Sequence, residues 1–380
     1  MKQLIAIILS STIIFSSSHL YADDLKQKIH SKGAVLIEQD SKRVLFEKNA
    51  YATMPMASTT KIMTCIVALE KGHLEDIVTV SQRAARAPAV KLHLKPNEKQ
   101  RLGDLLYSLM LESHNDTAVA IAEHIGGSVE EFCNMMTMKA KEIGAQNTCF
   151  KTPNGLDAAE HYTTAYDLAL IGAYALSNPK LVKIITTTSI NIPTQKLEGS
   201  KSHGLQNKNR FIYSYKGATG MKTGFTNKAG HCFVGSANQE GMQLIGVALA
   251  AGWGNKGKNQ KYRDVMTLMD YGFHHYKKYD VIVPQKDYAS IAVKKGVPDT
   301  LTLECSEKVT LPLSKEEKQN VVLKKVIPTS INAPVEKGEI VGRVEILYES
   351  NTLAQASLKA QNDVRKATVI DYIKKWFKMK

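Results

Sequence analysis

Apolar residues fill almost every position of one early stretch of the chain. Residues 62–69 read Ile-Met-Thr-Cys-Ile-Val-Ala-Leu. A helix that is apolar on all sides is buried on all sides in a folded protein, so we expect this one to run through a core. Lys61 stands directly before the run, and its side chain is therefore expected in a dry environment.

Strand patterns occur at both ends of residues 23–278, and helical patterns lie between them. Residues 33–38 and 43–47 flank a polar segment and are typical of a β-hairpin. A mostly helical stretch then runs from Ser58 to about Ser177. Further strands are predicted at 218–225, 231–237 and 243–250, and a helix at about 259–276. This order favours an α+β domain in which one antiparallel sheet, built from both ends of the segment, is covered by helices.

The pattern changes near Val281. Short apolar runs bounded by turn residues then follow at 290–293, 300–304, 309–312, 321–326, 340–348 and 353–359. Such spacing is typical of a small all-β sandwich. We therefore predict a catalytic domain over residues 23–278 and a β-sandwich domain over residues 279–364.

Both ends of the chain carry segments outside these domains. Residues 1–22 hold one lysine, a short apolar run broken by serines and a final small residue, which predicts a secretory signal peptide; an uncleaved anchor is the alternative. Residues 365–380 place apolar and basic side chains on opposite sides of a C-terminal amphipathic helix. The apolar side holds Val369, Ile370, Ile373, Trp376 and Phe377. We expect a peripheral anchor on the extracytoplasmic (periplasmic) face of the membrane, the alternative being a helix docked on the β-sandwich.

Composition narrows the function classes. The chain has 380 residues, 43% of them hydrophobic, and a formal net charge of +14. Export removes most nucleic acid from reach, and the lysines are spread along the chain, so an anionic membrane or cell-wall surface fits this charge better. The five cysteines show no paired spacing, which predicts neither a disulfide framework nor a metal knuckle. We expect no cofactor and no metal.

Ser58 and Lys61 stand three residues apart at the start of the apolar helix. Residues at that spacing share a helix face, so the hydroxyl and the amine can come within hydrogen-bonding distance. A buried lysine that loses its proton can act as a base near neutral pH, which requires lowering its pKa from about 10.4 to about 7. Burial and a second nearby cation can supply that shift, so we expect another basic residue at the site.

Two further triplets complete a catalytic set. Ser113-His114-Asn115 follows a helical run, and Lys222-Thr223-Gly224 lies inside a predicted strand. Ser-x-x-Lys, Ser-x-Asn and Lys-Thr-Gly in this order are the motifs of penicillin-recognising serine enzymes. Each triplet alone is a weak signal, and their order and context give the set its specificity.

On these residues the chain resembles the low-molecular-mass penicillin-binding proteins, a family of serine-type D-alanyl-D-alanine carboxypeptidases. Residues 152–157, 163–169 and 333–338 also resemble that family, and the resemblance covers essentially all of the chain after residue 22. It implies a penicillin-recognising transpeptidase-like fold. It also implies removal of the terminal D-alanine from peptidoglycan stem peptides and acylation by β-lactams.

The resemblance further implies a role for each motif residue. Ser58 is the nucleophile, Lys61 its base, and Ser113 relays a proton to the leaving amine. The implied substrate-binding residues are Asn115, Lys222, Thr223, Gly224 and Phe225. Lys222 is the second cation that the buried base requires, and the N–H groups of Ser58 and Phe225 form the oxyanion hole.

Three positions depart from the family pattern. Phe225 replaces a polar residue found in some members, but only its N–H is needed, so little is lost. His114 stands where the family has a small residue, so a bulky or titratable side chain can crowd or tune the site. Some members place an arginine for the substrate carboxylate after the strand that ends here near residue 250. This chain has Lys256 and Lys258 in that region, and both are candidates to replace it.

Three other functions share parts of this signature. A class A β-lactamase needs a glutamate-held water, and no Glu-x-x-Leu-Asn occurs between Ser113 and Lys222; the second domain would also be superfluous. A transpeptidase or endopeptidase of the same family differs only in the acyl acceptor or the bond cut, so the sequence leaves both open. An inactive scaffold would not need intact Ser58 and Lys61.

Overall fold

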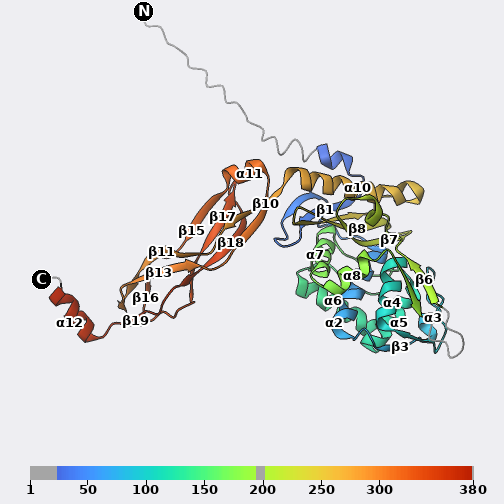
Figure 1. Ribbon diagram of the computed structural model, residues 1–380, viewed down its shortest axis with the longest axis horizontal. Coiled ribbons are helices and arrows are strands. Elements are labelled where there is room, and N and C mark those ends of the chain that lie inside the picture. Colours follow the sequence, from blue (N-terminus) through green and yellow to red (C-terminus); the bar gives the residue numbers. More distant parts are fainter. Residues whose placement is uncertain (1–23, 194–201, 379–380) are drawn as a thin grey trace, which may run out of the picture. The chain divides into compact units, whose positions relative to one another are not determined.

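The computed structural model describes residues 24–193 and 202–378 (Figure 1). The predicted signal peptide, residues 1–22, lies outside the described residues. The chain divides into two compact units: the first takes most of the chain up to Asp270, and the second takes Tyr271–Lys380 with the short segments 38–43 and 240–242.

A five-stranded sheet in the order β2-β1-β9-β8-β7 forms the centre of the first unit. β1 (Gly33–Glu38) and β2 (Val44–Lys48) come from the start of the chain, whereas β7 (Ala218–Thr226), β8 (Gly230–Gln239) and β9 (Met242–Leu249) follow the helical segment. The pairs β1–β2 and β7–β8 run antiparallel. The prediction of one sheet assembled from both ends of the domain is confirmed, and β7 lies at its edge.

Helices and short strands fill the segment between the two halves of the sheet. In chain order the elements are η1 (Ala57–Thr60), α2 (Lys61–Lys71), β3 (Ile77–Thr79), α3 (Gln82–Ala85), β4 (Lys99–Arg101), α4 (Leu102–Tyr107), η2 (Ser108–Glu112), α5 (Asn115–Gly126), α6 (Val129–Ile143), α7 (Ala165–Leu176), α8 (Pro179–Thr186), β5 (Ser189–Pro193), β6 (Ser202–Gln206) and α9 (Phe211–Ser214), with α10 (Gly254–His275) after the sheet. α2 is buried from Lys61 to Ala68, as its apolar run predicted. The β3–β4 and β5–β6 ribbons were not predicted, because their strands are short and of mixed polarity.

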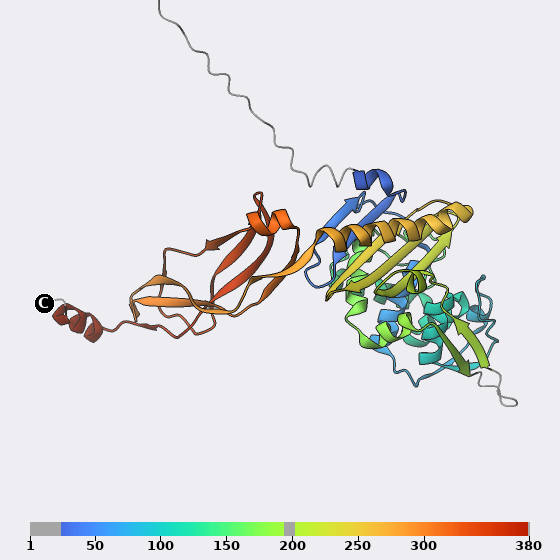
Figure 2. The ribbon, with the colours of Figure 1, turned by 45° about the horizontal axis from the view of Figure 1, so that its top comes forward.

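Helices cover both faces of the sheet (Figure 2). α10 lies on one face, where a Cβ at Gly246 of β9 would be 3.2 Å from Met269. α7 lies on the other, where a Cβ at Gly172 would be 3.3 Å from Ile245 of β9. Because successive residues of a strand point to opposite faces, the neighbours Ile245 and Gly246 face different helix layers.

The second unit is rich in β-structure. Its six-stranded sheet has the order β15-β17-β18-β13-β11-β16, and β10 pairs with β14 and β12 with β19. The elements are β10 (Lys277–Ile282), β11 (Gln285–Lys294), β12 (Gly296–Val297), β13 (Thr300–Cys305), β14 (Val309–Leu313), α11 (Lys315–Asn320), β15 (Val322–Val326), β16 (Ser330–Asn332), β17 (Ile340–Tyr348), β18 (Asn351–Ala360), β19 (Arg365–Lys366) and α12 (Val369–Lys378). Each of the six predicted apolar runs overlaps a strand, which confirms the predicted β-rich class of this part of the chain.

The C-terminal helix α12 exposes its apolar side. Ile370, Ile373, Trp376 and Phe377 are each more than half exposed. None of the described helices is by itself long and apolar enough to cross a membrane; α7 and α8 together have the length and composition, but they meet at a bend of 103°.

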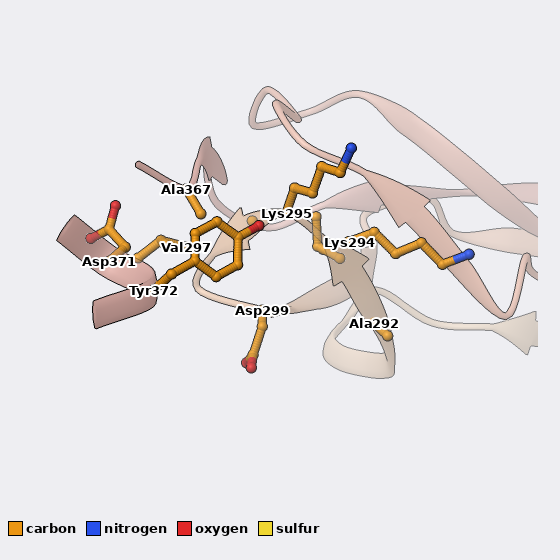
Figure 3. Close-up of a pocket in the computed structure, with 10 residues that line it drawn as sticks. Ala292, Lys294, Lys295, Val297, Asp299, Ala367, Asp371 and Tyr372 are labelled. Carbon is orange, nitrogen blue, oxygen red and sulfur yellow. The ribbon is translucent and has the colours of Figure 1, made fainter. Parts of the chain in front are cut away.

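A pocket opens beside the start of α12 (Figure 3). Tyr372 of the helix contributes to its lining, together with Lys294 and Lys295 from the end of β11. The neighbouring Asp371 accepts two hydrogen bonds from Arg365 of β19, at 2.7 and 2.8 Å. This ion pair fastens the first turn of α12 to the β-rich unit while the apolar side of the helix remains exposed.

Candidate active site

The Ser58 hydroxyl and the Lys61 amine meet where η1 passes into α2. Lys61 Nζ lies 3.0 Å from Ser58 Oγ, 2.8 Å from Asn115 Oδ1 and 2.6 Å from the carbonyl oxygen of Asn154. The Lys61 side chain is completely buried, whereas Ser58 is partly exposed. The predicted nucleophile and its predicted base are therefore in direct contact.

The partners of Lys61 suit both protonation states of its amine. A neutral amine has two N–H donors, and the oxygens of Asn115 and Asn154 accept them because neither oxygen can donate. The remaining lone pair then faces Ser58 Oγ, which can donate its proton. After that proton has moved, the ammonium has three donors for the same three oxygens. Proton transfer from Ser58 to Lys61 thus requires no movement of these heavy atoms.

The Lys222 amine lies close enough to Lys61 to affect its pKa. Burial lowers the pKa of Lys61 well below its usual value, and the Lys222 amine lowers it further, while Asp116 opposes the shift. Lys222 is itself buried on β7, and burial together with the Lys261 amine lowers its pKa to about 7. Lys222 is therefore a second basic group beside Lys61, of the kind that the sequence analysis required.

Lys261 of α10 is a basic residue of this region that the sequence analysis did not single out. It is 6% exposed, and burial lowers its pKa to about 8, although Cys232 opposes the shift. Lys258 and Arg210 add positive charge to the same cluster. Lys258 and Lys261 are one turn apart on a helix, so a helix-face analysis could have grouped them. In the described part of the chain no interaction joins Lys256 to this cluster.

Asn115 connects the base to the segment before α4. Its Nδ2 donates to the two carbonyl oxygens of residues 88–89, at 3.1 and 3.0 Å, while its Oδ1 accepts from Lys61. The adjacent Asp116 carboxylate accepts two backbone N–H groups of residues 92–94, at 3.0 and 3.1 Å. Both ends of the Asn115 amide are thus engaged, and Lys61 is held against a firmly attached loop.

Ser113 and His114 point to different surroundings. Ser113 ends η2 with φ 69°, and its hydroxyl makes no hydrogen bond to any other described residue. His114 is buried in the helical core, where its Nδ1 lies 2.8 Å from Ser108 Oγ. Burial lowers the pKa of His114 to about 4, so its imidazole is neutral near pH 7. His114 is therefore a buried, neutral side chain of this helical region, and the Lys61 amine also acts to lower its pKa.

The edge strand β7 runs beside residues Ala57–Thr60 (η1), which carry the predicted nucleophile and are called the nucleophile turn below. A Cβ at Gly224 would lie 2.8 Å from the backbone nitrogen of Ser58, a distance that side chains do not tolerate. Gly224 therefore allows the strand to approach the N–H of Ser58. Lys222 precedes this point and is buried, Thr223 is partly exposed, and Phe225 follows and is 44% exposed.

The segment 152–157 closes the other side of the nucleophile turn. Gly155 has φ 84°, and a Cβ there would collide with the carbonyl oxygen of Ala57. The Thr64 hydroxyl donates to the carbonyl of Pro153 at 2.6 Å, which holds the segment against α2. The sequence analysis noted these residues only for their family resemblance, because the carbonyl of Asn154 acts through backbone that any residue supplies.

The described residues contain no group of three or more histidine, cysteine, aspartate or glutamate side chains that could hold a metal ion. The five cysteines are free thiols. Burial raises the pKa of Cys65 to about 12, so this residue, one turn after Lys61, is an inert packing group.

Both units of the chain are similar to known proteins. Residues 21–252 match the family described as D-alanyl-D-alanine carboxypeptidase, and residues 276–366 match the penicillin-binding protein 5 C-terminal domain. The chain is 34% identical to D-alanyl-D-alanine carboxypeptidase DacF of Bacillus subtilis over 92% of its own length and 91% of that protein. It is 29% identical to DacA of Escherichia coli over 99% and 96% of the two lengths. Penicillin-binding protein 5 from Haemophilus influenzae has a similar structure, with a TM-score of 0.77, 27% identity and coverage of 89% of this chain and 98% of that one.

Gly155→Ala should lower the free energy of unfolding by about 2–4 kcal/mol. The new side chain would be strained by the left-handed backbone, and its Cβ would also collide with the carbonyl oxygen of Ala57. Gly127→Ala is the matched control. Gly127 has φ 70° with open space around its Cβ position, so only the backbone cost of about 1–2 kcal/mol applies. Denaturant unfolding measures both losses. Equal losses would contradict the close approach at Gly155.

Proposed function

Because the chain belongs to the D-alanyl-D-alanine carboxypeptidase family, we propose that it removes the terminal D-alanine from peptidoglycan stem pentapeptides through an ester on Ser58. β-Lactams acylate the same serine. The observation that carries this proposal is the 3.0 Å contact between Ser58 Oγ and the buried amine of Lys61.

In the first step Lys61 takes the proton of Ser58 while Ser58 Oγ attacks the carbonyl carbon of the D-Ala-D-Ala bond. Ser113 relays a proton to the leaving amine, and the terminal D-alanine departs. Water then hydrolyses the ester, and Ser58 regains its proton. The lowered pKa of Lys61 supports the assignment of the base, because a neutral amine can accept the serine proton.

We assign substrate binding to the edge of β7. The backbone N–H groups of Ser58 and Phe225 receive the negative oxygen of the tetrahedral intermediate, and Gly224 leaves room for this approach. Lys222 and Thr223 bind the terminal carboxylate of the peptide.

Lys261 adds positive charge behind Lys222 and thereby favours the same carboxylate. Asn115 holds Lys61 and residues 88–89. Its assigned contact with the substrate backbone requires one of these hydrogen bonds to be exchanged.

Ser58→Ala should abolish both D-alanine release from a peptide ending in D-Ala-D-Ala and covalent labelling by penicillin, because the nucleophile is gone. Ser177→Ala is the matched control, since Ser177 and Lys180 form a second Ser-x-x-Lys sequence outside the site. Mass spectrometry of the intact protein and of its peptides measures the label. A label on any residue other than Ser58 would contradict the proposal.

The lifetime of this label separates the alternatives. An adduct that lasts for minutes supports a carboxypeptidase, whereas hydrolysis within seconds indicates a β-lactamase. Transfer of the acyl group to an added amine indicates transpeptidation, and cleavage of cross-linked peptides indicates endopeptidase activity. Both of these sub-activities use the same residues.

The acylation rate should rise with pH and reach a plateau well below pH 10, because neutral Lys61 predominates above its lowered pKa. Lys222→Met removes the nearby positive charge, so the pKa of Lys61 should rise and the rising limb should move to higher pH. Lys256→Met, at an exposed site, should leave the limb in place. Rates of penicillin acylation between about pH 5 and pH 9 test this. An unmoved limb in Lys222→Met would show that Lys222 does not tune Lys61.

The family acts on peptidoglycan peptides, so we place the reaction outside the cytoplasm. We propose that residues 1–22 direct export, residues 23–278 form the catalytic domain and residues 279–364 the second domain. Residues 365–380 then anchor the protein on the membrane as a peripheral helix. The exposed apolar side of α12 supports this last assignment.

The double variant Ile373→Ser/Trp376→Ser should bind lipid vesicles at least 10-fold more weakly, since burying each such side chain contributes about 1.5–3 kcal/mol. Flotation with vesicles of phosphatidylcholine and phosphatidylglycerol measures the bound fraction. Val322→Ser, which removes an exposed apolar group from β15, is the control and should bind like the parent. Unchanged binding of the double variant would exclude α12 as the anchor.

A further inference from the structure

We propose that His161, acting through Thr60, is a positioning residue that fixes the Ala57–Ser58 peptide and so aims the Ser58 N–H at the reacting oxygen. This inference rests on the proposed function. His161 does not belong to any of the three motifs. In the hydrogen-bond network described above, it makes no direct bond to Ser58 Oγ or Lys61.

Two hydrogen bonds connect His161 to the nucleophile turn, and a third fixes its ring. The backbone N–H of Lys151 donates to His161 Nδ1 at 3.0 Å. His161 Nε2 lies 3.0 Å from Thr60 Oγ1, and Thr60 Oγ1 lies 2.8 Å from the carbonyl oxygen of Ala57. Thr60 is completely buried and His161 is 6% exposed, so bulk water does not compete for these bonds.

The direction of each bond follows from its neighbour. Because Nδ1 accepts an N–H from Lys151, the ring proton is on Nε2, which donates to Thr60 Oγ1. The Thr60 hydroxyl then uses its own proton for the Ala57 carbonyl. The imidazole is neutral, since burial lowers the pKa of His161 to about 4 although Asp157 opposes the shift. The relay therefore keeps one orientation over the pH range in which the enzyme is assayed.

The Ala57 carbonyl matters because it belongs to the same peptide as the Ser58 N–H. In a planar trans peptide the C=O and the N–H point in opposite directions, so holding the oxygen sets the direction of the hydrogen. Ala57 has φ 49°, a left-handed conformation that costs a non-glycine residue about 1–2 kcal/mol and must be held by its surroundings. Gly155 leaves space for the carbonyl on one side, and Gly224 leaves space for the N–H beside β7.

Thr59 provides the comparison within the same turn. Its hydroxyl donates to the carbonyl oxygen of Met56 at 2.6 Å, so it makes the same local type of bond and is also completely buried. That carbonyl belongs to the preceding peptide, whose N–H is not the proposed oxyanion donor. Loss of the Thr59 hydroxyl should therefore cost stability without the same effect on acylation.

The test compares acylation by a fluorescent penicillin in stopped flow. Thr60→Val and His161→Leu should lower the acylation rate constant by about 10- to 100-fold, part of the loss seen when an oxyanion donor is removed, and leave the binding constant of the first complex unchanged. Thr60→Ser keeps the hydroxyl and should stay within about 3-fold of the parent. Thr59→Val should match the stability loss of Thr60→Val but not its rate loss. The double variant Thr60→Val/His161→Leu should be no slower than the slower single variant, because both residues act through one contact.

Parent-like acylation in both Thr60→Val and His161→Leu overturns the inference, and so does an equal rate loss in Thr59→Val. If the parent itself is not acylated on Ser58, the proposed function fails instead.

A measurement on the unmodified protein tests the proposal even where a variant does not fold. Nitrogen NMR of His161 should show a proton on Nε2 and none on Nδ1 at pH 7, with no titration above about pH 5; a proton on Nδ1, or titration near pH 6, overturns the relay.

Discussion

Lys61 keeps its amine completely buried between the Ser58 hydroxyl, the Asn115 side chain and the Asn154 carbonyl. An isolated ammonium in such a place is costly, whereas a neutral amine with both N–H groups bonded is not. Three segments that are far apart in the sequence must therefore converge on one nitrogen atom. The apolar helix α2 supplies the dry surroundings, and the first residue of α5 and the loop before α7 supply the oxygens.

This convergence leaves no room for side chains on either side of the nucleophile turn. Gly155 lies against the Ala57 carbonyl, and Gly224 of the edge strand lies against the Ser58 N–H. The Ala57–Ser58 peptide is thus enclosed by backbone on both sides, in a conformation that Ala57 would not adopt alone. A turn enclosed in this way can offer its N–H to a substrate without first rearranging, which is the condition for effective stabilisation of a developing negative charge.

The residues that could be predicted are those whose side chains carry the chemistry. Ser58 and Lys61 stand three residues apart across the junction of η1 and α2, so their spacing predicts their contact, and the strands of the central sheet follow from apolar runs. Asn154 and Gly155 could not be predicted in the same way, because one acts through a carbonyl oxygen and the other through the lack of a side chain. Lys261 of α10 lowers the pKa of Lys222 because the fold brings the two residues close together, and no local sequence pattern predicts that proximity. The β5–β6 ribbon was missed because its apolar residues are too few to form a pattern.

The positive charge of Lys222 on β7 acts on the base and belongs to the proposed site of the substrate carboxylate. Lys222 lowers the pKa of Lys61, but burial and Lys261 also lower the pKa of Lys222, so its own charge is incomplete near neutral pH. A substrate carboxylate beside Lys222 favours the ammonium form and opposes that loss. The restored charge favours the neutral form of Lys61, whereas the carboxylate, being negative, favours its ammonium form, as Asp116 does. In the proposed complex these two opposite charges oppose each other at Lys61, so burial remains the main cause of its lowered pKa.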